Sequence, residues 1–222
     1  MVGTSSSYVA QGERVAADSG ITIGVLALQG DFQAHRRAVE RAGAAATEVR
    51  AEADLRDIDG LIIPGGESTT MLKLLHIEKL FEPLQQFGQR NPVFGTCAGA
   101  ILLASEVLHP RQESLGLMDL TVERNAYGRQ IDSRIAQLEI SGKTAEAVFI
   151  RAPIIRKVGP ETKVLASYLG NPVLVEQRFH LVATFHPELS EENEIHHHFV
   201  NNVIRWKGAS RANRRGWNSC EQ

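Results

Sequence analysis

Apolar residues recur along the chain in short blocks that alternate with stretches of helical periodicity. The blocks predict buried strands at residues 21–28, 45–49, 61–63 and 93–94. Helical spacing follows three of them, in a helix capped by Asp31, a helix that carries Met71 and Leu75, and a helix after Cys97. This alternation predicts a three-layer, flavodoxin-like α/β fold with a mostly parallel sheet and helices on both faces.

The middle of the chain changes to short strands separated by Gly and Pro. Strands are expected at residues 120–123, 135–140, 148–150 and 173–175, and they predict short antiparallel additions to the parallel sheet. A last strand ends before His186, and the final helix presents Ile195, Phe199 and Val203 on one apolar face. We therefore expect one domain over residues 21–206, preceded by a disordered leader (1–20) and followed by a polar tail (207–222).

Composition and charge exclude several classes of protein. The chain has 222 residues, of which 43% are hydrophobic, and a net charge of -2, so it can bury a core but has no basic surface for nucleic acid. No apolar run is long enough to span a bilayer, which predicts no membrane partner. Two cysteines, Cys97 and Cys220, make no disulfide framework and favour a reducing, cytoplasmic location.

Cys97 is the first candidate for chemistry. It lies in the sequence GTCAG, between a short apolar strand and an apolar helix. This G-x-C-x-G pattern is the cysteine counterpart of the nucleophile elbow, in which a strained strand-to-helix turn exposes the reactive side chain. The start of the helix also favours a thiolate. The alternative is a buried, inert cysteine in a strand-helix corner.

A partner for this thiol follows the last predicted strand, in the sequence FHPEL. Residues two apart on an extended chain project to the same side, so Glu188 can approach the imidazole of His186 across Pro187. A carboxylate there holds the tautomer of the histidine and stabilises its protonated form. We therefore predict a triad of Cys97, His186 and Glu188, against the alternative of a surface loop with an incidental His and Glu.

Further polar groups fall at the ends of predicted strands. The glycines of PGGEST suit a place where bare backbone N–H groups face an oxyanion, and the N–H of Ala98 is the expected second donor. Ser68 could instead simply cap the next helix. Arg124 and Arg151 each follow a short strand and could bind a carboxylate, although a solvated surface role is the commoner one for arginine.

No metal site is predicted. Residues 196–198 are three consecutive histidines on a helix, and they point to different faces and cannot converge on one ion. His35 and His180 lack ligand-like spacing to other His, Cys or carboxylate residues.

The motifs GTCAG, PGGEST, FHPEL, ERNAYGRQ and FIRAP together resemble those of the class I, triad-type glutamine amidotransferases over residues 21–206. The last two, with PGGEST, are similar to the branch that provides glutaminase subunits of pyridoxal 5'-phosphate synthase. The resemblance implies a class I glutamine amidotransferase-like fold, hydrolysis of L-glutamine, and delivery of ammonia to a (β/α)8-barrel synthase subunit in a hetero-oligomer. It implies no cofactor in this subunit.

The resemblance also assigns roles to residues. It implies that Cys97 is the nucleophile, that His186 and Glu188 complete the triad, and that Gly66 and Ala98 form the oxyanion hole. The glutamine-binding residues that it implies are Gly66, Glu67, Ser68, Arg124, Ile150 and Arg151. The alternatives are a γ-glutamyl hydrolase or cysteine peptidase on the same scaffold, and a non-catalytic regulatory module.

Overall fold

The computed structural model describes residues 20–124, 133–140 and 142–218, with side chains up to residue 210. The predicted leader, except for Gly20, lies outside the described residues. The part of ERNAYGRQ after Arg124 and the second cysteine, Cys220, also lie outside them.

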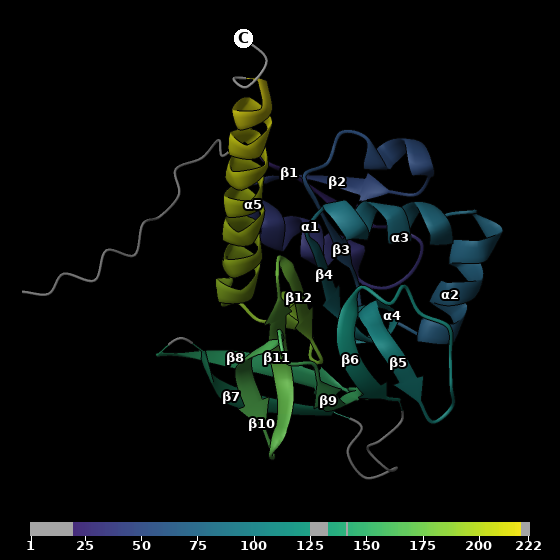
Figure 1. Cartoon of the computed structure of the whole chain (residues 1–222). Helices are drawn as coiled ribbons and strands as arrows, with labels where there is room; N and C mark the ends of the chain where they lie inside the picture. The colour runs from purple at the N-terminus through teal and green to yellow at the C-terminus, as the bar shows by residue number, and fades with distance from the viewer. Residues whose placement is uncertain (1–19, 125–132, 141, 219–222) are drawn as a thin grey trace, which may run out of the picture.

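A seven-stranded sheet forms the centre of the described part of the chain, in the order β10-β11-β12-β4-β3-β1-β2 (Figure 1). Its parallel portion consists of β12, β4, β3, β1 and β2, and β11 and β10 extend one edge antiparallel. The bounds are β1 Thr22–Leu26, β2 Ala45–Val49, β3 Gly60–Ile63, β4 Val93–Thr96, β10 Lys163–Tyr168, β11 Asn171–Gln177 and β12 His180–Ala183. The predicted α/β fold with a mostly parallel sheet is confirmed.

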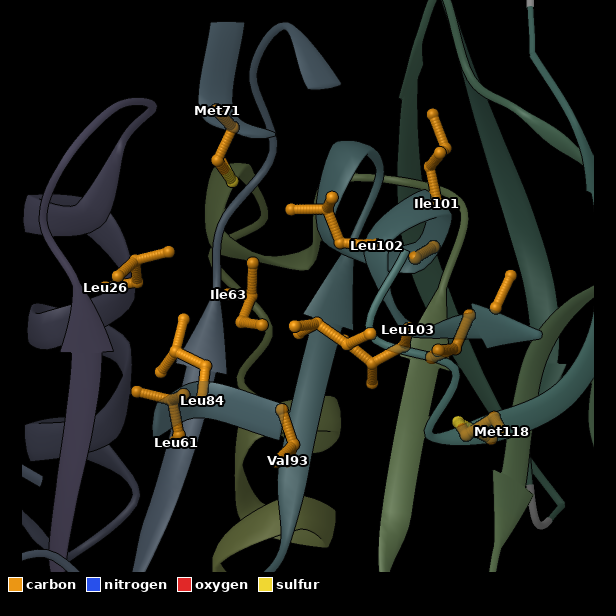
Figure 2. Packing of buried hydrophobic residues seen from close by; sticks show 14 of the residues in the cluster. Leu26, Leu61, Ile63, Met71, Leu84, Val93, Ile101, Leu102, Leu103 and Met118 are labelled. Atoms are coloured by element: carbon orange, nitrogen blue, oxygen red, sulfur yellow. The ribbon is translucent and has the colours of Figure 1, made fainter. Parts of the chain in front are cut away.

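Helices cover both faces of this sheet because side chains alternate along the strands. On β3, Leu61 and Ile63 pack into the hydrophobic cluster of α2, α3 and α4, whereas Ile62 packs into that of α1 and α5. Figure 2 shows the first cluster, in which Leu84 lies beside β3 near Leu61 and Met71 lies beyond the end of that strand. The bounds are α1 Phe32–Arg41, α2 Ser68–Ile77, α3 Phe81–Arg90, α4 Ala98–Leu103 and α5 Glu194–Asn218.

Further strands form two small sheets separate from the seven-stranded sheet. The hairpin β7–β8 is antiparallel, and β5, β6 and β9 form a small sheet in which β6 pairs antiparallel with β9 but parallel with β5. The bounds are β5 Ala104–Leu108, β6 Met118–Glu123, β7 Ser133–Ile140, β8 Lys143–Ile150 and β9 Ile154–Val158, with short 3-10 helices η1 Glu52–Leu55 and η2 Pro187–Leu189. Antiparallel additions were therefore predicted correctly, and the parallel β5–β6 pair was not.

The last helix is longer than the sequence predicts. A polar tail is expected from residue 207, but α5 continues to Asn218 (Figure 1). Lys, Ala and Arg are good helix formers and no proline interrupts this stretch, so the helix continues after its apolar face has ended. No helix within the described residues is long and apolar enough to cross a lipid bilayer.

The parallel strands bring separate parts of the chain to one edge of the sheet. Carboxyl ends of neighbouring parallel strands meet, and here they place Pro64–Gly66 after β3, Cys97 after β4 and His186 after β12 beside one another. In an open α/β sheet this edge is where ligands bind.

Candidate active site

Cys97 occupies a strained turn between β4 and α4. Its backbone has φ of 49° and ψ of -100°, a combination that residues with a side chain rarely adopt. Its backbone N–H donates to the carbonyl of Ala183 on β12, which fixes the turn against the neighbouring strand. The cysteine is 6% exposed, and its Sγ lies 3.9 Å from the carbonyl oxygen of Ile150. This is the geometry of a nucleophile elbow.

The glycines of the GTCAG motif let the elbow pack tightly. A Cβ atom added to Gly95 would lie 2.6 Å from the carbonyl carbon of Gly99, and one added to Gly99 would overlap the carbonyl oxygen of Ile63. Both obstacles are backbone atoms, which cannot move aside as a flexible side chain can. The two glycines therefore allow α4 to start directly against β3 and β4.

Replacing Gly99 by alanine is expected to disturb the elbow. The added methyl group collides with β3, so the free energy of unfolding should fall by about 1–3 kcal/mol, and alkylation of Cys97 by iodoacetamide should slow. Urea unfolding and alkylation rates measure the two effects. Gly208→Ala is the matched control, because no atom lies within 4 Å of its added Cβ. Equal stability of both variants would contradict the packing argument.

His186 and Glu188 form a hydrogen-bonded pair beside the elbow. The Nδ1 atom of His186 lies 2.7 Å from Oε1 of Glu188, whose side chain is 1% exposed. The expected contact is present, but its cause differs from the prediction. Pro187–Leu189 form a 3-10 turn rather than an extended strand, and this turn folds the carboxylate back under the ring.

The surroundings of His186 favour its charged form. Burial disfavours the imidazolium, but the hydrogen bonds with Cys97 and Glu188 and the charges of both groups outweigh it and raise the pKa of His186 to about 10. Burial would also raise the pKa of Glu188, but the nearby rings of His35 and His186 lower it, so the carboxylate stays ionised. The triad thus holds a protonated base between a sulfur and a carboxylate.

A pocket of about 180 Å³ opens at this edge of the sheet, and Cys97, Ala98 and His186 line it. The volume suits a ligand the size of an amino acid rather than a larger molecule. Every predicted glutamine-binding residue also lines it: Gly66, Glu67, Ser68, Arg124, Ile150 and Arg151. Glu188 lies behind His186, outside the lining.

Comparison with known proteins identifies the family. The profile of the SNO glutamine amidotransferase family matches residues 25–205. This chain belongs to the SNO glutamine amidotransferase family. Pyridoxal 5'-phosphate synthase subunit PdxT of Solibacter usitatus is 58% identical over 189 residues, which cover 82% of this chain and 98% of the relative. PdxT of Thermosipho africanus is 50% identical over 184 residues, covering 82% and 98%.

Solved structures agree with this assignment. A crystal structure of a glutamine amidotransferase, 44% identical, superposes with a TM-score of 0.77 and covers 82% of this chain and 98% of its own. The structure of PurLQS from Thermotoga maritima, 16% identical, has a TM-score of 0.61 over 84% of this chain and 96% of its own. The second likeness shows the fold alone. The expected class I glutamine amidotransferase-like fold is thereby confirmed.

Glu67 caps helix α2 at the pocket in this member of the family. Its carboxylate accepts hydrogen bonds from the backbone N–H groups of Thr69 (3.0 Å) and Thr70 (2.7 Å). Burial works against the charge, but these hydrogen bonds, with one from the Thr70 hydroxyl, lower the pKa of Glu67 to about 2. The alternative that Ser68 is the cap is wrong. Ser68 is the first helical residue, and its hydroxyl donates to Gln112 Oε1.

The two predicted arginines both line the pocket, but they differ in exposure. Arg124 is mostly buried, its Nη2 donates to Thr69 Oγ1 at 2.8 Å, and it lies 3.5 Å from the carboxylate of Glu67. The guanidinium is therefore held in place before any ligand arrives. Arg151 is exposed and has a positive φ of 45°, which turns the chain directly after β8 and beside the sulfur-facing carbonyl of Ile150.

Several residues of the site were not predicted from the sequence. Ile101 and Pro153 complete the lining, and Gln112 and Thr69 hold Ser68 and Arg124. Pro153 and Thr69 lie within motifs already recognised, FIRAP and PGGEST, so the signal was available. No sequence motif pointed to Gln112, because it lies in the connection between β5 and β6 and contacts Ser68 only through the tertiary fold.

Proposed function

We propose that this chain is a glutaminase that releases ammonia from L-glutamine through a thioester on Cys97 and delivers it to a partner synthase subunit that makes pyridoxal 5'-phosphate. One observation supports this above the others. The elbow cysteine, its histidine and all six predicted glutamine-binding residues surround a single pocket of amino-acid size. Close relatives named as pyridoxal 5'-phosphate synthase subunits, matched over nearly their whole length, support the same conclusion.

The geometry is suited to acyl transfer in two steps, which are acylation of Cys97 and hydrolysis of the thioester. The Cys97 sulfur attacks the side-chain amide carbon of glutamine, and the carbonyl oxygen takes the negative charge, for which the N–H groups of Gly66 and Ala98 are the proposed donors. Protonated His186 gives its proton to the amide nitrogen as the C–N bond breaks, and ammonia leaves. Neutral His186 then takes a proton from water, whose oxygen attacks the thioester; glutamate is released, the sulfur leaves as a thiolate, and the protonated ring is restored.

The pocket wall explains why a free amino acid fits this chemistry. Glutamine carries an α-carboxylate, and the fixed guanidinium of Arg124 offers it a charged hydrogen bond. Because this contact is remote from the reacting amide, it contributes equally to the ground state and the transition state.

Arg124→Gln is therefore expected to raise KM for glutamine by about 10–100-fold while kcat changes less than about threefold. Initial rates over a range of glutamine concentrations measure both constants. Arg178→Gln is the control, because Arg178 is exposed and lies away from the pocket. A fall in kcat with unchanged KM would contradict a binding role for Arg124.

The proposed partner is a synthase subunit with a (β/α)8-barrel fold, in a hetero-oligomer in the cytoplasm. The cytosol keeps thiols reduced, which would preserve a nucleophilic Cys97 and supports this location. Ammonia serves synthesis only if it reaches the second active site before water protonates it, so the two subunits must form a tight interface around the transfer. No role in binding nucleic acid or membranes is proposed.

The test is to combine the chain with the barrel subunit and to follow glutamate and pyridoxal 5'-phosphate. Glutamate release should increase on mixing, and pyridoxal 5'-phosphate should form with glutamine as the nitrogen source. Peptides and folate polyglutamates serve as competing substrates. Hydrolysis of either in preference to glutamine would replace the proposal by a peptidase or a γ-glutamyl hydrolase.

A further inference from the structure

A second histidine ring faces the triad carboxylate from the side opposite His186. His35 on α1 is fully buried, and its Nε2 lies 3.3 Å from Glu188 Oε2 and 3.2 Å from the Thr96 hydroxyl. Its Nδ1 lies 3.0 Å from Nε2 of His196, which is 1% exposed on α5. Glu188 thus lies between two imidazole rings, with Oε1 toward His186 and Oε2 toward His35.

The donors and acceptors of this network allow one consistent arrangement. An ionised carboxylate only accepts, so the proton of neutral His35 belongs on Nε2, between Thr96 and Glu188. The Nδ1 of His35 must then accept from Nε2–H of His196. That leaves Nδ1 of His196 without a proton, in agreement with its lack of any hydrogen-bond partner among the described residues. The unprotonated nitrogen at the outer end of this series of hydrogen bonds, Nδ1 of His196, is an acceptor. The N–H protons of both rings lie on the side nearer Glu188.

Both rings of this network are neutral at ordinary pH. Burial lowers the pKa of His35 and of His196, and for His35 it outweighs the attraction of Glu188 and of Asp31 at the start of its own helix. His186, next to Glu188, adds to this lowering. The network therefore acts through the direction of its hydrogen bonds and not through a charge of its own.

A structural role alone accounts poorly for these rings. Buried polar groups cost free energy unless they are well paired, and one nitrogen of His196 is unpaired within the described residues. Apolar side chains of similar size would fill the space between α1, α5 and β4 at lower cost. What the histidines add is a polar ring nitrogen 3.3 Å from Glu188 Oε2, an atom that makes no hydrogen bond among the described residues and has this nitrogen as a close polar neighbour.

We propose that His35 is a positioning residue, which holds Oε2 of Glu188 so that Oε1 stays aligned on His186, and that His196 sets the tautomer of His35. The proposal rests on the proposed glutaminase function. It gives the first of the three consecutive histidines a role that metal-ligand spacing does not reveal. The third histidine of that run, His198, is not part of the network, since it pairs with Glu176.

The test compares two variants, assayed with the barrel subunit. His35→Leu removes the donor, whereas His35→Gln carries an amide N–H that can reach the position of Nε2. Because the supports that orient a functional side chain typically contribute about 10–100-fold, His35→Leu should lower kcat by about that factor, with KM changed less than about twofold. His35→Gln should keep kcat within about threefold of the parent protein.

A second measurement reads the tautomer of His35 directly, without an activity assay. Nitrogen NMR of histidine-labelled protein should show His35 as the Nε2–H tautomer, and in His196→Leu this preference should weaken. A proton on Nδ1 of His35 in the parent protein would overturn the proposal, as would an unchanged kcat in His35→Leu or equal losses in both His35 variants. If the parent protein itself releases no glutamate, the proposed function has failed instead.

Discussion

Replacing Cys97 by alanine is expected to reduce glutamine hydrolysis by about 10⁴-fold or more, to the limit of detection, with little change in stability. Cys97 is the one sulfur among the residues that line the pocket, and the hydroxyl of Ser68, which could form only an ester, donates to Gln112. Glutamate release in the presence of the barrel subunit measures the loss, and thermal unfolding measures the stability. The alanine methyl fits where the larger thiol stood, so the fold should survive.

Cys220→Ser provides the control for this result. Cys220 is the other cysteine of the sequence, far along the chain from the motifs of the site, and its replacement should leave the rate unchanged. Substantial turnover by Cys97→Ala would remove the nucleophile assignment and with it the thioester mechanism. Loss of activity in Cys220→Ser alone would relocate the chemistry to the end of the chain.

Replacing His186 by asparagine is expected to cost about 10⁴-fold in kcat and to change how Cys97 responds to pH. The raised pKa of His186, about 10, keeps the ring protonated beside the sulfur throughout the neutral range. A cation beside the sulfur favours the reactive thiolate, so alkylation of Cys97 by iodoacetamide should depend less on pH between 7 and 9 than it does without the ring. In His186→Asn, which lacks this cation, the alkylation rate should be lower at pH 7 and should rise more steeply with pH.

The sign of this effect follows from which partner carries the proton. Below pH 10 the parent protein keeps a proton on the imidazole, so the positive charge beside the sulfur persists from pH 7 to 9. In the variant the neutral asparagine provides no positive charge at this position. Both proteins should also carry Cys220→Ser, so that Cys97 is the one cysteine that can react with iodoacetamide. Parallel pH profiles in the two proteins would show that His186 does not control the thiol.

Short-range patterns sufficed for the fold and for finding the Cys97 and His186 side chains that the sheet brings to one pocket. The apolar blocks that form β1, β2, β3 and β4 were enough to predict the parallel sheet. A parallel sheet places the carboxyl ends of its strands at one edge, independently of the conformation of its loops. Cys97 and His186 were recognisable because each directly follows such a strand. The predicted N-cap of α1 is also confirmed, since Asp31 accepts from the N–H of Ala34.

Features that depend on packing escaped prediction. Helix α3 contains Pro83 and Gly88, both poor helix formers, yet Gly88 allows close contact with Leu117 and the helix forms over the core. Strand β5 begins directly after α4, without the turn residues that mark a new element. Glu67 caps α2 because its carboxylate reaches the N–H groups of Thr69 and Thr70, which the sequence pattern does not show. The contact of His35 with Glu188 joins residues far apart in the chain.

Acid-quenched mass spectrometry during turnover tests the central claim most directly. The chain, combined with the barrel subunit and glutamine, should carry a γ-glutamyl group on the peptide that contains Cys97, and hydroxylamine should remove this group as expected for a thioester. The adduct should be absent from Cys97→Ala. Steady release of glutamate with no acylated Cys97 at any time, or an adduct on another residue, would contradict the account.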